Sequence, residues 1–429
     1  MAAEWHEVVL GELAEIFDGP HATPPKSQDG PIFLGISNLA NGRLDLSNTE
    51  HLSEEHYEQW TRRVVPQPGD VVFSYETRLG EAAFIPRGLR CCLGRRMGLL
   101  RARNGKVDKR FLLYAYLGPE FQETLRSRTI HGSTVDRIPL IDMPGFPIRV
   151  PTKIAEQRAI AKILSALDDK IELNRRMNET LEAMARALFK SWFVDFDPVR
   201  AKPEGRDPGL PKAIVDLFPD HLVDSELGEI PEGWSTKCLD ELARFVNGLA
   251  LQKYPPGEKS LPVIKISQLR SRSTDGADRA SADLDPDYIV QDGDILFSWS
   301  GSLECVLWAG GRGALNQHLF KVIPAGYPRW LSYFAIHLHL EDFRHIAAGK
   351  ATTMGHIQRH HLSDARLAVP PPPLISAADN IMEPMVESLW GREVQSRTLG
   401  VIRDALLPKL ISGELRVKEA ERVVAEAAA

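Results

Sequence analysis

The sequence predicts an α+β protein in which two repeated α/β domains are separated by two long antiparallel coiled-coil helices. Three observations predict this fold class. The same sequence blocks occur twice in the same order, each set of blocks ends at a proline, and a long stretch free of proline and glycine follows the first set. The chain has 429 residues, which is enough for two or three domains of about 100–200 residues each.

The clearest repeat pairs QPGDVVFSYETRL at residues 67–79 with QDGDILFSWSGSL at residues 291–303, an offset of 224 (291 − 67). Other blocks keep the same order in both halves: WHEVVLGELAEIFDG with WSTKCLDELARFVNG, LGISNL with IKISQL, RFLLYAY with RWLSYFA, and GSTVDRI with ATTMGHI. Ordered blocks with small insertions between them are difficult to produce by chance. They therefore indicate a duplicated domain.

Each copy is expected to contain strands followed by a helix. The segments VVFSY and ILFSW are short, β-branched and aromatic, and each follows a Gly-Asp turn signal. The segments PIFLGIS and LPVIKIS have the same character. In KRFLLYAYLGPEFQETLRSR, and in its counterpart RWLSYFAIHLHLEDFRHIA, apolar residues recur at helical spacing.

A heptad pattern predicts the first long helix. Thr152 can act as its N-cap, and neither proline nor glycine occurs between Pro151 and Pro198. Residues that step by alternate fours and threes form a coiled-coil seam, which we expect to contact a partner helix. The seam residues are Ile160, Leu164, Leu167, Ile171, Asn174, Asn178, Leu181 and Leu188. The two asparagines would lower stability but fix the register, unless a slightly different register turns one or both to solvent.

The second long helix follows four consecutive prolines at residues 370–373. Its apolar stripe is expected to consist of Leu399, Ile402, Leu406 and Leu410, which would pair with the first helix in antiparallel fashion. Prolines and glycines inside it make the pattern less regular and put its continuity in doubt: Pro384, Gly391, Gly400 and Pro408.

These patterns divide the chain into six expected segments. They are a first globular domain at residues 1–151, a first long helix at 152–196, a Pro-, Gly- and Asp-rich linker at 197–233, a second globular domain at 234–370, a second long helix at 374–418 and a C-terminal tail at 419–429. A continuous helix over residues 154–192 would span about 58 Å at about 1.5 Å per residue.

The composition is typical of an ordinary globular protein, with 43% hydrophobic and 26% charged residues. No apolar run reaches the ~18 residues that a membrane helix needs, and the N-terminal segment MAAEWHEVVL does not resemble a secretory signal. We therefore expect a cytoplasmic protein without a membrane partner. The four cysteines are expected to be free thiols: Cys91, Cys92, Cys238 and Cys305.

Motifs for catalysis or metal binding are not found in the sequence. There is no G-x-G-x-x-G after a strand, no Walker loop and no serine elbow. Asp168-Asp169-Lys170 matches the end of a nuclease-type pattern, but a charge run in the middle of a helix is usually a solvated face. Several histidines gather between His337 and His361, yet no acidic or cysteine partner lies at ligand spacing. We expect no metal site, and we expect these histidines to face solvent or phosphate.

Charge is distributed unevenly along the chain. The net charge of −6 argues weakly against nucleic acid. From Arg78 to Arg103, however, seven arginines stand against one glutamate, a local charge of +6. Arginine suits bidentate contacts to phosphate and to guanine edges. Basic loops in both copies therefore favour DNA as the ligand, although an arginine-rich surface can also serve solubility alone.

The ordered blocks resemble the specificity subunit of type I restriction–modification systems. The resemblance covers nearly the whole chain, and its most specific carriers are GDVVFSY with GDILFSW, GSTVDRI with ATTMGHI, the long helix that begins IAEQRAIAKILSALDDKIELNRRMNETLEAMARALF, DSELGEIPEGW and LLPKLISGEL. The resemblance implies that residues 1–151 and 234–370 are target-recognition domains, each of which reads one half of a split double-stranded DNA sequence.

The resemblance also implies partners. Two methylation subunits would dock on the long helices, and restriction subunits would join them. This chain would then be a non-catalytic subunit without a cofactor of its own, because S-adenosylmethionine, ATP and Mg²⁺ would bind to the partners. A partner would flip an adenine in each half-site out of the base stack. The helix spacing would place the two readers more than one DNA turn apart, since a turn is about 34–36 Å.

We expect basic loops of each domain to enter the major groove and to contact phosphates on either side. The residues expected to contact DNA follow from their positions in the repeat: Arg78, Arg95, Arg96, Ser133, Thr134 and Arg137 in the first copy, and Ser302, Gln317, His318, Lys350, Thr352, Thr353 and His356 in the second. The alternatives are a coiled-coil protein-interaction scaffold without DNA recognition and an enzyme that acts by itself.

Overall fold

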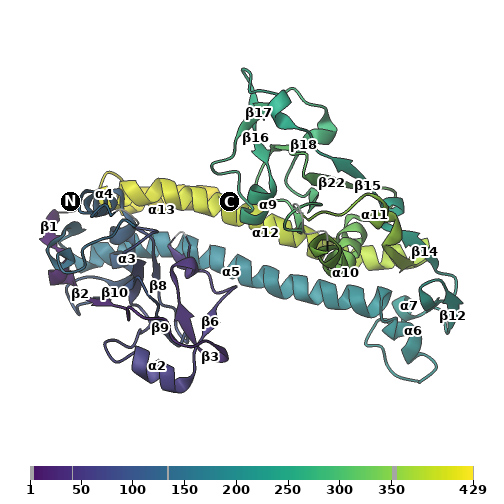
Figure 1. The fold of residues 1–429 in the computed structure, drawn as a ribbon, viewed down its shortest axis with the longest axis horizontal. Helices are drawn as coiled ribbons and strands as arrows, with labels where there is room; N and C mark the ends of the chain where they lie inside the picture. Colours follow the sequence, from purple (N-terminus) through teal and green to yellow (C-terminus); the bar gives the residue numbers. More distant parts are fainter. Residues whose placement is uncertain (1–3, 41, 133–134, 350–354, 429) are drawn as a thin grey trace. The chain divides into compact units, whose positions relative to one another are not determined.

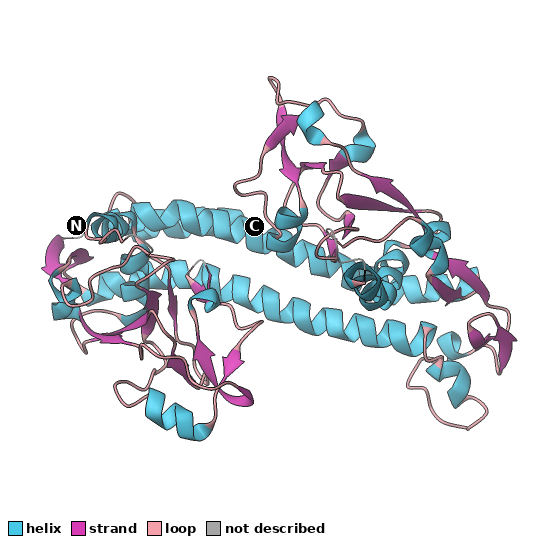
Figure 2. Cartoon of the chain, in the orientation of Figure 1, coloured by secondary structure: helices cyan, strands magenta, loops and turns pink. Residues whose placement is uncertain are grey.

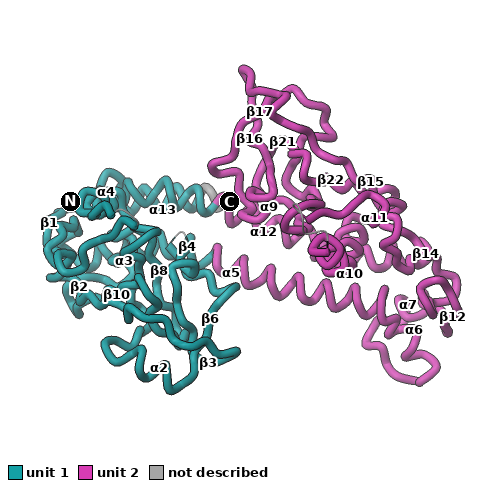
Figure 3. Tube along the Cα trace, in the orientation of Figure 1, with its two compact units in different colours: residues 1–170, 399–429 teal, residues 171–398 magenta. Residues whose placement is uncertain are grey.

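The computed structural model describes residues 4–40, 42–132, 135–349 and 355–428. The chain forms two compact units: unit 1 contains residues 1–170 and 399–429, and unit 2 contains residues 171–398 (Figure 3). Each unit combines one sheet-rich globular domain with parts of two long helices (Figure 2). The expected α+β class with long helices is therefore confirmed.

Unit 1 is organised around a four-stranded antiparallel sheet with the strand order β2-β10-β7-β8. A smaller sheet, β6-β3-β9, contains the parallel pair β3–β9, and β1 pairs with β11. The elements are β1 (Trp5–Val9), α1 (Leu10–Leu13), β2 (Ala14–Asp18), β3 (Ser27–Leu34), β4 (Leu39–Ala40), β5 (Arg43–Leu44), β6 (Glu50–His51), α2 (Glu54–Trp60), β7 (Val71–Ser74), β8 (Ala82–Phe84), β9 (Cys91–Leu93), β10 (Met97–Ala102), α3 (Lys109–Leu117), α4 (Pro119–Ser127) and β11 (Pro147–Pro151).

Unit 2 repeats this topology. Its central sheet has the order β15-β22-β19-β20, a second sheet contains the parallel pair β16–β21, and β14 pairs with β23. Figure 1 shows the central-sheet strands β15 and β22 side by side. Its elements are α6 (Asp197–Ala201), α7 (Lys212–Val215), β12 (Leu222–Ser225), β13 (Gly228–Pro231), β14 (Ser235–Cys238), α8 (Leu239–Leu242), β15 (Ala243–Asn247), β16 (Ser260–Ile264), α9 (Ile266–Ser271), β17 (Arg279–Ser281), β18 (Ile289–Val290), β19 (Ile295–Ser298), β20 (Cys305–Leu307), β21 (Gly313–Leu315), β22 (Leu319–Pro324), α10 (Arg329–Ala348), α11 (His360–Asp364) and β23 (Arg366–Val369). The repeated blocks are thus a duplicated fold.

The repeated Gln-x-Gly-Asp motif builds the turn before the central strands β7 and β19. Asp70 Oδ2 accepts a hydrogen bond from the backbone N–H of Gln67 at 2.8 Å, and Asp294 accepts the same bond from Gln291 at 2.8 Å. Such a local side-chain bond holds a turn in place. This structural role explains why the motif occurs in both copies.

Two other motif positions also have structural roles. Gly69 and Gly293 adopt φ angles of +97° and +90°, which glycine adopts without strain. After the strand, Ser74 Oγ donates to the carbonyl of Glu76, and Ser298 Oγ donates to the carbonyl of Ser302, each at 2.6 Å. The serines therefore fix the first residues of the loop that follows each strand.

The first long helix, α5, extends from Ile154 to Phe193, and the second, α12, extends from Pro372 to Ser412. In unit 1, Asp168 forms a 2.7 Å ion pair with Arg403. In unit 2, the amide of Asn174 donates to Gln395 Oε1 at 2.8 Å, and that of Asn178 donates to the carbonyl of Leu389 at 2.8 Å. The residue numbers of the contacting α12 residues fall as those of the α5 residues rise, so the two helices are antiparallel.

The residues expected on the helix seam lie at this contact or beside it. Seven are buried: Ile160, Leu164, Leu167, Ile171, Asn174, Leu406 and Leu410. Five are half-buried: Asn178, Leu181, Leu188, Leu399 and Ile402. Both asparagines therefore face the other helix and not solvent.

The second long helix differs from the expected bounds of 374–418. It continues through its internal prolines and glycines but ends at Ser412, because Gly413 adopts a left-handed φ of +77°. A separate helix, α13 (Val417–Ala428), occupies most of the segment that was expected to be a tail. Val417, Ala420 and Val424 of α13 pack against the core of unit 1. Their spacing of three and four residues was a helical signal.

The nuclease-like pair Asp168-Asp169 is also only partly as expected. Asp169 is a solvated residue that pairs with Arg110. Asp168 points into unit 1, where its carboxylate accepts hydrogen bonds from Tyr114 and Arg403. This carboxylate therefore joins the globular domain to both long helices.

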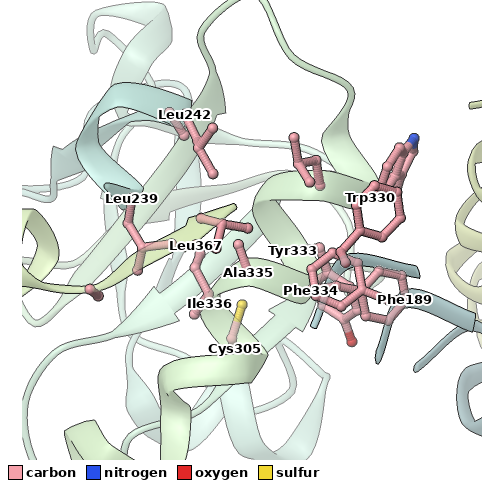
Figure 4. Packing of buried hydrophobic residues seen from close by; sticks show 14 of the residues in the cluster. Phe189, Leu239, Leu242, Cys305, Trp330, Tyr333, Phe334, Ala335, Ile336 and Leu367 are labelled. Atoms are coloured by element: carbon pink, nitrogen blue, oxygen red, sulfur yellow. The ribbon is translucent and has the colours of Figure 1, made fainter. Parts of the chain in front are cut away.

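Aromatic side chains connect the helices of unit 2 to its globular domain. Phe189 of α5 packs against Phe334 of α10, with ring centroids 5.6 Å apart (Figure 4). Phe193 packs against Trp330, with ring centroids 5.4 Å apart. Within the described residues, no helix combines the length and the apolar character needed to span a membrane.

Candidate nucleic-acid interface

Three loop segments meet beside the central sheet of unit 1. The first follows β7, the second precedes β10 and the third follows α4. The N–H of Tyr75 donates to the carbonyl of Arg96 at 3.2 Å, and that of Ile138 donates to the carbonyl of Tyr75 at 2.8 Å. Glu76 and Arg137 form an isolated antiparallel bridge. We call residues 75–81, 95–96 and 135–138 junction 1.

Unit 2 contains the same arrangement. The N–H of Trp299 donates to the carbonyl of His318 at 3.4 Å, and that of Ile357 donates to the carbonyl of Trp299 at 2.9 Å. Ser300 and His356 form the isolated bridge. We call residues 299–304, 317–318 and 355–357 junction 2. The backbone contacts are the same in both junctions, although most of the side chains differ.

The described residues that were expected to bind DNA all lie in these two junctions. Junction 1 contains Arg78, Arg95, Arg96 and Arg137, and junction 2 contains Ser302, Gln317, His318 and His356. The remaining expected residues lie outside the described part of the chain: Ser133, Thr134, Lys350, Thr352 and Thr353.

Ion pairs with carboxylates compensate most of the local charge of +6 in residues 78–103. Most of these arginines form ion pairs with carboxylates, several of which come from distant parts of the sequence: Arg78 with Glu81, Arg90 with Glu54, Arg96 with Glu76, Arg101 with Asp70 and Arg103 with Glu15. The expectation of a strongly basic segment was therefore too simple, because folding brings acidic partners to it.

Arg95 and Arg137 are the exposed arginines of junction 1 that form no ion pair with a described residue. Both guanidinium groups are therefore available to an anionic ligand. Arg96 is held differently, since its Nε lies 2.9 Å from Glu76 Oε2 and its Nη1 donates to Thr77 Oγ1 at 3.3 Å.

Junction 2 contains neutral and titratable groups where junction 1 has arginines. The hydroxyl of Ser300 lies 3.0 Å from His318 Nδ1, and the amide of Gln317 lies 3.4 Å from His318 Nε2. The indole N–H of Trp299 donates to Asn247 Oδ1 at 2.9 Å. Amide, hydroxyl and imidazole groups can form hydrogen bonds with base edges.

Sequence reasoning missed four members of the junctions and one neighbour of junction 2. The members are Glu76, Thr77, Trp299 and Ser300, and the neighbour is Asn247. A signal for four of them was present, since they lie inside the aligned blocks at residues 67–79 and 291–303. Asn247 also lies in an aligned block, WSTKCLDELARFVNG at residues 234–248, but its place beside junction 2 follows only from the structure, where it accepts a hydrogen bond from Trp299.

A cleft of about 450 Å³ opens beside junction 2. Arg344 of α10 contributes to its wall and donates from Nε to the carbonyl of Leu303 at 3.1 Å. The other lining residues include Gly301, Ser302, Glu304 and Gly355. The cleft thus exposes part of the loop that contains Ser302.

The described residues hold no group of three or more His, Cys, Asp or Glu side chains that could bind a metal ion. The cysteines are buried free thiols, and burial raises the pKa of Cys91 and Cys92 to about 12. Both side chains therefore stay protonated near neutral pH, and the thiolate that metal ligation and nucleophilic attack require is scarce.

The family model of the type I restriction modification DNA specificity domain matches residues 2–183 and 231–376. These two matches contain both junctions. The chain belongs to the type I restriction–modification specificity-subunit family. The two sheet-rich domains of this specificity subunit are therefore two copies of one family domain.

Relatives of similar length agree with this assignment. The specificity subunit is 24% identical over 444 residues to the type I restriction enzyme MjaIX specificity subunit of Methanocaldococcus jannaschii, covering 97% of this chain and 94% of the relative. It is 23% identical over 473 residues to the HindI specificity subunit of Haemophilus influenzae, covering 96% and 100%. Its fold is similar to the crystal structure of a type I S subunit from M. genitalium, with a TM-score of 0.53 and 14% identity over 95% of this chain and 96% of the other.

Proposed function

We propose that this specificity subunit recognises a bipartite double-stranded DNA target, with one half-site bound at junction 1 and the other at junction 2. One observation carries the proposal: the two domains keep the same backbone contacts at the junction but place different side chains on them. A duplicated reader of two unlike half-sites needs this combination. The described residues that would contact DNA are Arg78, Arg95, Arg96, Arg137, Ser302, Gln317, His318 and His356.

The specificity subunit would also dock two methylation subunits, to which restriction subunits would be added. Leu173, Met177 and Met184 support this part of the proposal, since they form an exposed apolar stripe on α5 in unit 2. Their spacing of four and seven residues places them on one face of the helix. A face of this kind suits a helix of a partner protein. S-adenosylmethionine, ATP and Mg²⁺ would act on the partners.

Salt-dependent DNA binding tests the first part. The full chain is titrated with a fluorescent duplex of random sequence at about 50 mM and 200 mM salt, where phosphate contacts should weaken binding strongly. In R95Q/R137Q, the negative slope of log K against log salt should become shallower by about 1.8, or roughly 0.9 for each lost phosphate contact. R87Q removes another exposed arginine outside the junction and should keep the wild-type slope. Negligible binding at both salt concentrations would instead favour a protein scaffold.

Partner docking has a separate test. The methylation subunit is co-purified with a full chain that carries either M177E/M184E or the matched change R176E. Arg176 is an exposed α5 position outside the stripe. We expect the first variant to lose the methylation subunit and the second to keep it. Normal recovery of the complex with M177E/M184E would contradict docking on this face.

A further inference from the structure

We infer that Glu76, Thr77 and Arg96 act together as a unit that reads one G·C base pair in the half-site bound by the first domain. This inference rests on the proposed function and names a base pair within it. It also adds two residues, Glu76 and Thr77, to the DNA-contacting surface.

The three side chains form a connected and accessible cluster. Arg96 Nε lies 2.9 Å from Glu76 Oε2, and Arg96 Nη1 donates to Thr77 Oγ1 at 3.3 Å. The side chain of Arg96 is 33% exposed and that of Glu76 is 25% exposed. A guanidinium carries five N–H donors, so these contacts leave donors for a ligand while they restrict the direction of the side chain.

The backbone of the cluster is strained. Thr77 and Arg96 adopt φ angles of +69° and +72°, which are unfavourable for residues that carry a Cβ atom. At the position of Thr77, the second domain has Gly301 with a φ of +67°, and glycine adopts this conformation without strain. Strain of this kind is concentrated at functional sites. The contact of Thr77 with Arg96 is a reason to keep a threonine there.

The second domain shows which feature varies between the copies. At the positions of Glu76 and Arg96 it has Ser300 and His318, and the hydroxyl lies 3.0 Å from the imidazole Nδ1. In both domains, an aromatic residue follows the central strand, β7 or β19. The residue after this aromatic residue contacts the residue that precedes the neighbouring strand, β10 or β22. The contact persists while its chemistry changes from a charged pair to a neutral or titratable pair, as a difference in half-site sequence requires.

The chemistry of the charged pair matches a G·C base pair. In the major groove, guanine presents the acceptors O6 and N7, and cytosine presents the donor N4. Arg96 can donate to guanine while Glu76 accepts from the neighbouring cytosine. Adenine would instead place its N6 donor against the guanidinium, which has no acceptor.

A selection experiment with residue exchange between the copies tests this inference. The full chain, in complex with its methylation subunit, selects duplexes from a randomised library, and the enriched target is sequenced. In E76S/R96H, which copies the second domain, one G·C position of the first half-site should become degenerate. The discrimination at that position should fall by about 5-fold to 150-fold. The second half-site should stay unchanged.

The reciprocal variant S300E/H318R should gain a G·C preference in the second half-site, which a defect in folding cannot produce. E123S/R126H changes an exposed ion pair on α4 and should leave the target unchanged. R96K keeps the charge but loses the planar fork, so full discrimination by R96K would overturn the inference. An unchanged target in E76S/R96H would overturn it as well. Failure of the wild-type complex to enrich any target would instead overturn the proposed function.

Discussion

The neighbouring residues Asp168 and Asp169 allow a sharp test of how unit 1 is held together. Asp168 accepts a 2.7 Å hydrogen bond from the hydroxyl of Tyr114 and forms a 2.7 Å ion pair with Arg403. Its side chain is 16% exposed and that of Arg403 is 12% exposed. Asp169 is 63% exposed, and its ion pair with Arg110 lies at the surface. We expect D168A to destabilise unit 1 far more than D169A.

The magnitude follows from the groups left without a partner. Burial raises the pKa of Tyr114 well above its usual value, so this hydroxyl is a donor that loses its acceptor in D168A. An orphaned buried donor costs about 1–3 kcal/mol, and breaking a buried ion pair costs about 3–5 kcal/mol. Arg403 keeps Asp404 at 2.7 Å as a second partner, which offsets part of that cost. We therefore expect a loss of about 3–4 kcal/mol in D168A, against about 0–1 kcal/mol in D169A.

Hydrogen–deuterium exchange of the full chain measures this difference locally. The free energy of opening is compared between the variants for peptides that cover residues 154–170 and 399–412, because the chain has two units and a global transition would mix them. Equal protection of both helices in D168A and D169A would refute the assignment of Asp168 as the residue that joins the domain to the helices.

Two further predictions concern unit 2. Asn174 is 1% exposed, and its Oδ1 accepts no hydrogen bond from a described residue. Because a buried acceptor without a partner is costly, N174L should raise the free energy of unfolding by about 1 kcal/mol. A clear loss of stability in urea denaturation would contradict this prediction. Burial, together with the guanidinium of Arg186, lowers the pKa of His337 to about 4, although Glu182 opposes this shift. Below about pH 6.5 the unfolded chain binds a proton that the folded chain accepts only near pH 4, so unit 2 should lose up to about 3 kcal/mol of stability as pH falls through this window. H337L should flatten this part of the stability profile measured by thermal melting, and an unchanged profile would exclude His337 as its source.

Much of the fold was accessible from the sequence because the evidence was periodic and repeated. The heptad spacing around Leu164 predicted α5, whose face is buried as such spacing requires. The ordered blocks predicted a duplicated domain, and the two central sheets have the same strand order. The end of α12 was misjudged, since only the backbone shows that Gly413 adopts a left-handed conformation.

The junctions were harder to predict because they join loops that are distant in the sequence. Tyr75, Arg96 and Ile138 meet through backbone hydrogen bonds that no local pattern encodes. The histidines show the same limitation. His337 was expected to face solvent or phosphate, but α10 turns it toward Arg186 of α5, where the two side chains lie 3.2 Å apart. A position on a helix does not reveal which neighbour covers that face.

The sequence by itself determined the duplication, the two long helices and the family, because repeats and heptads are properties of spacing along one chain. Only the tertiary structure decided which charges are free. In the folded chain, Glu15, Glu54 and Asp70 lie beside arginines of residues 90–103, although they are distant from them in the sequence. A Coulomb interaction depends on distance through space and not on separation along the chain, so the arginines available to DNA could be identified only in the folded protein.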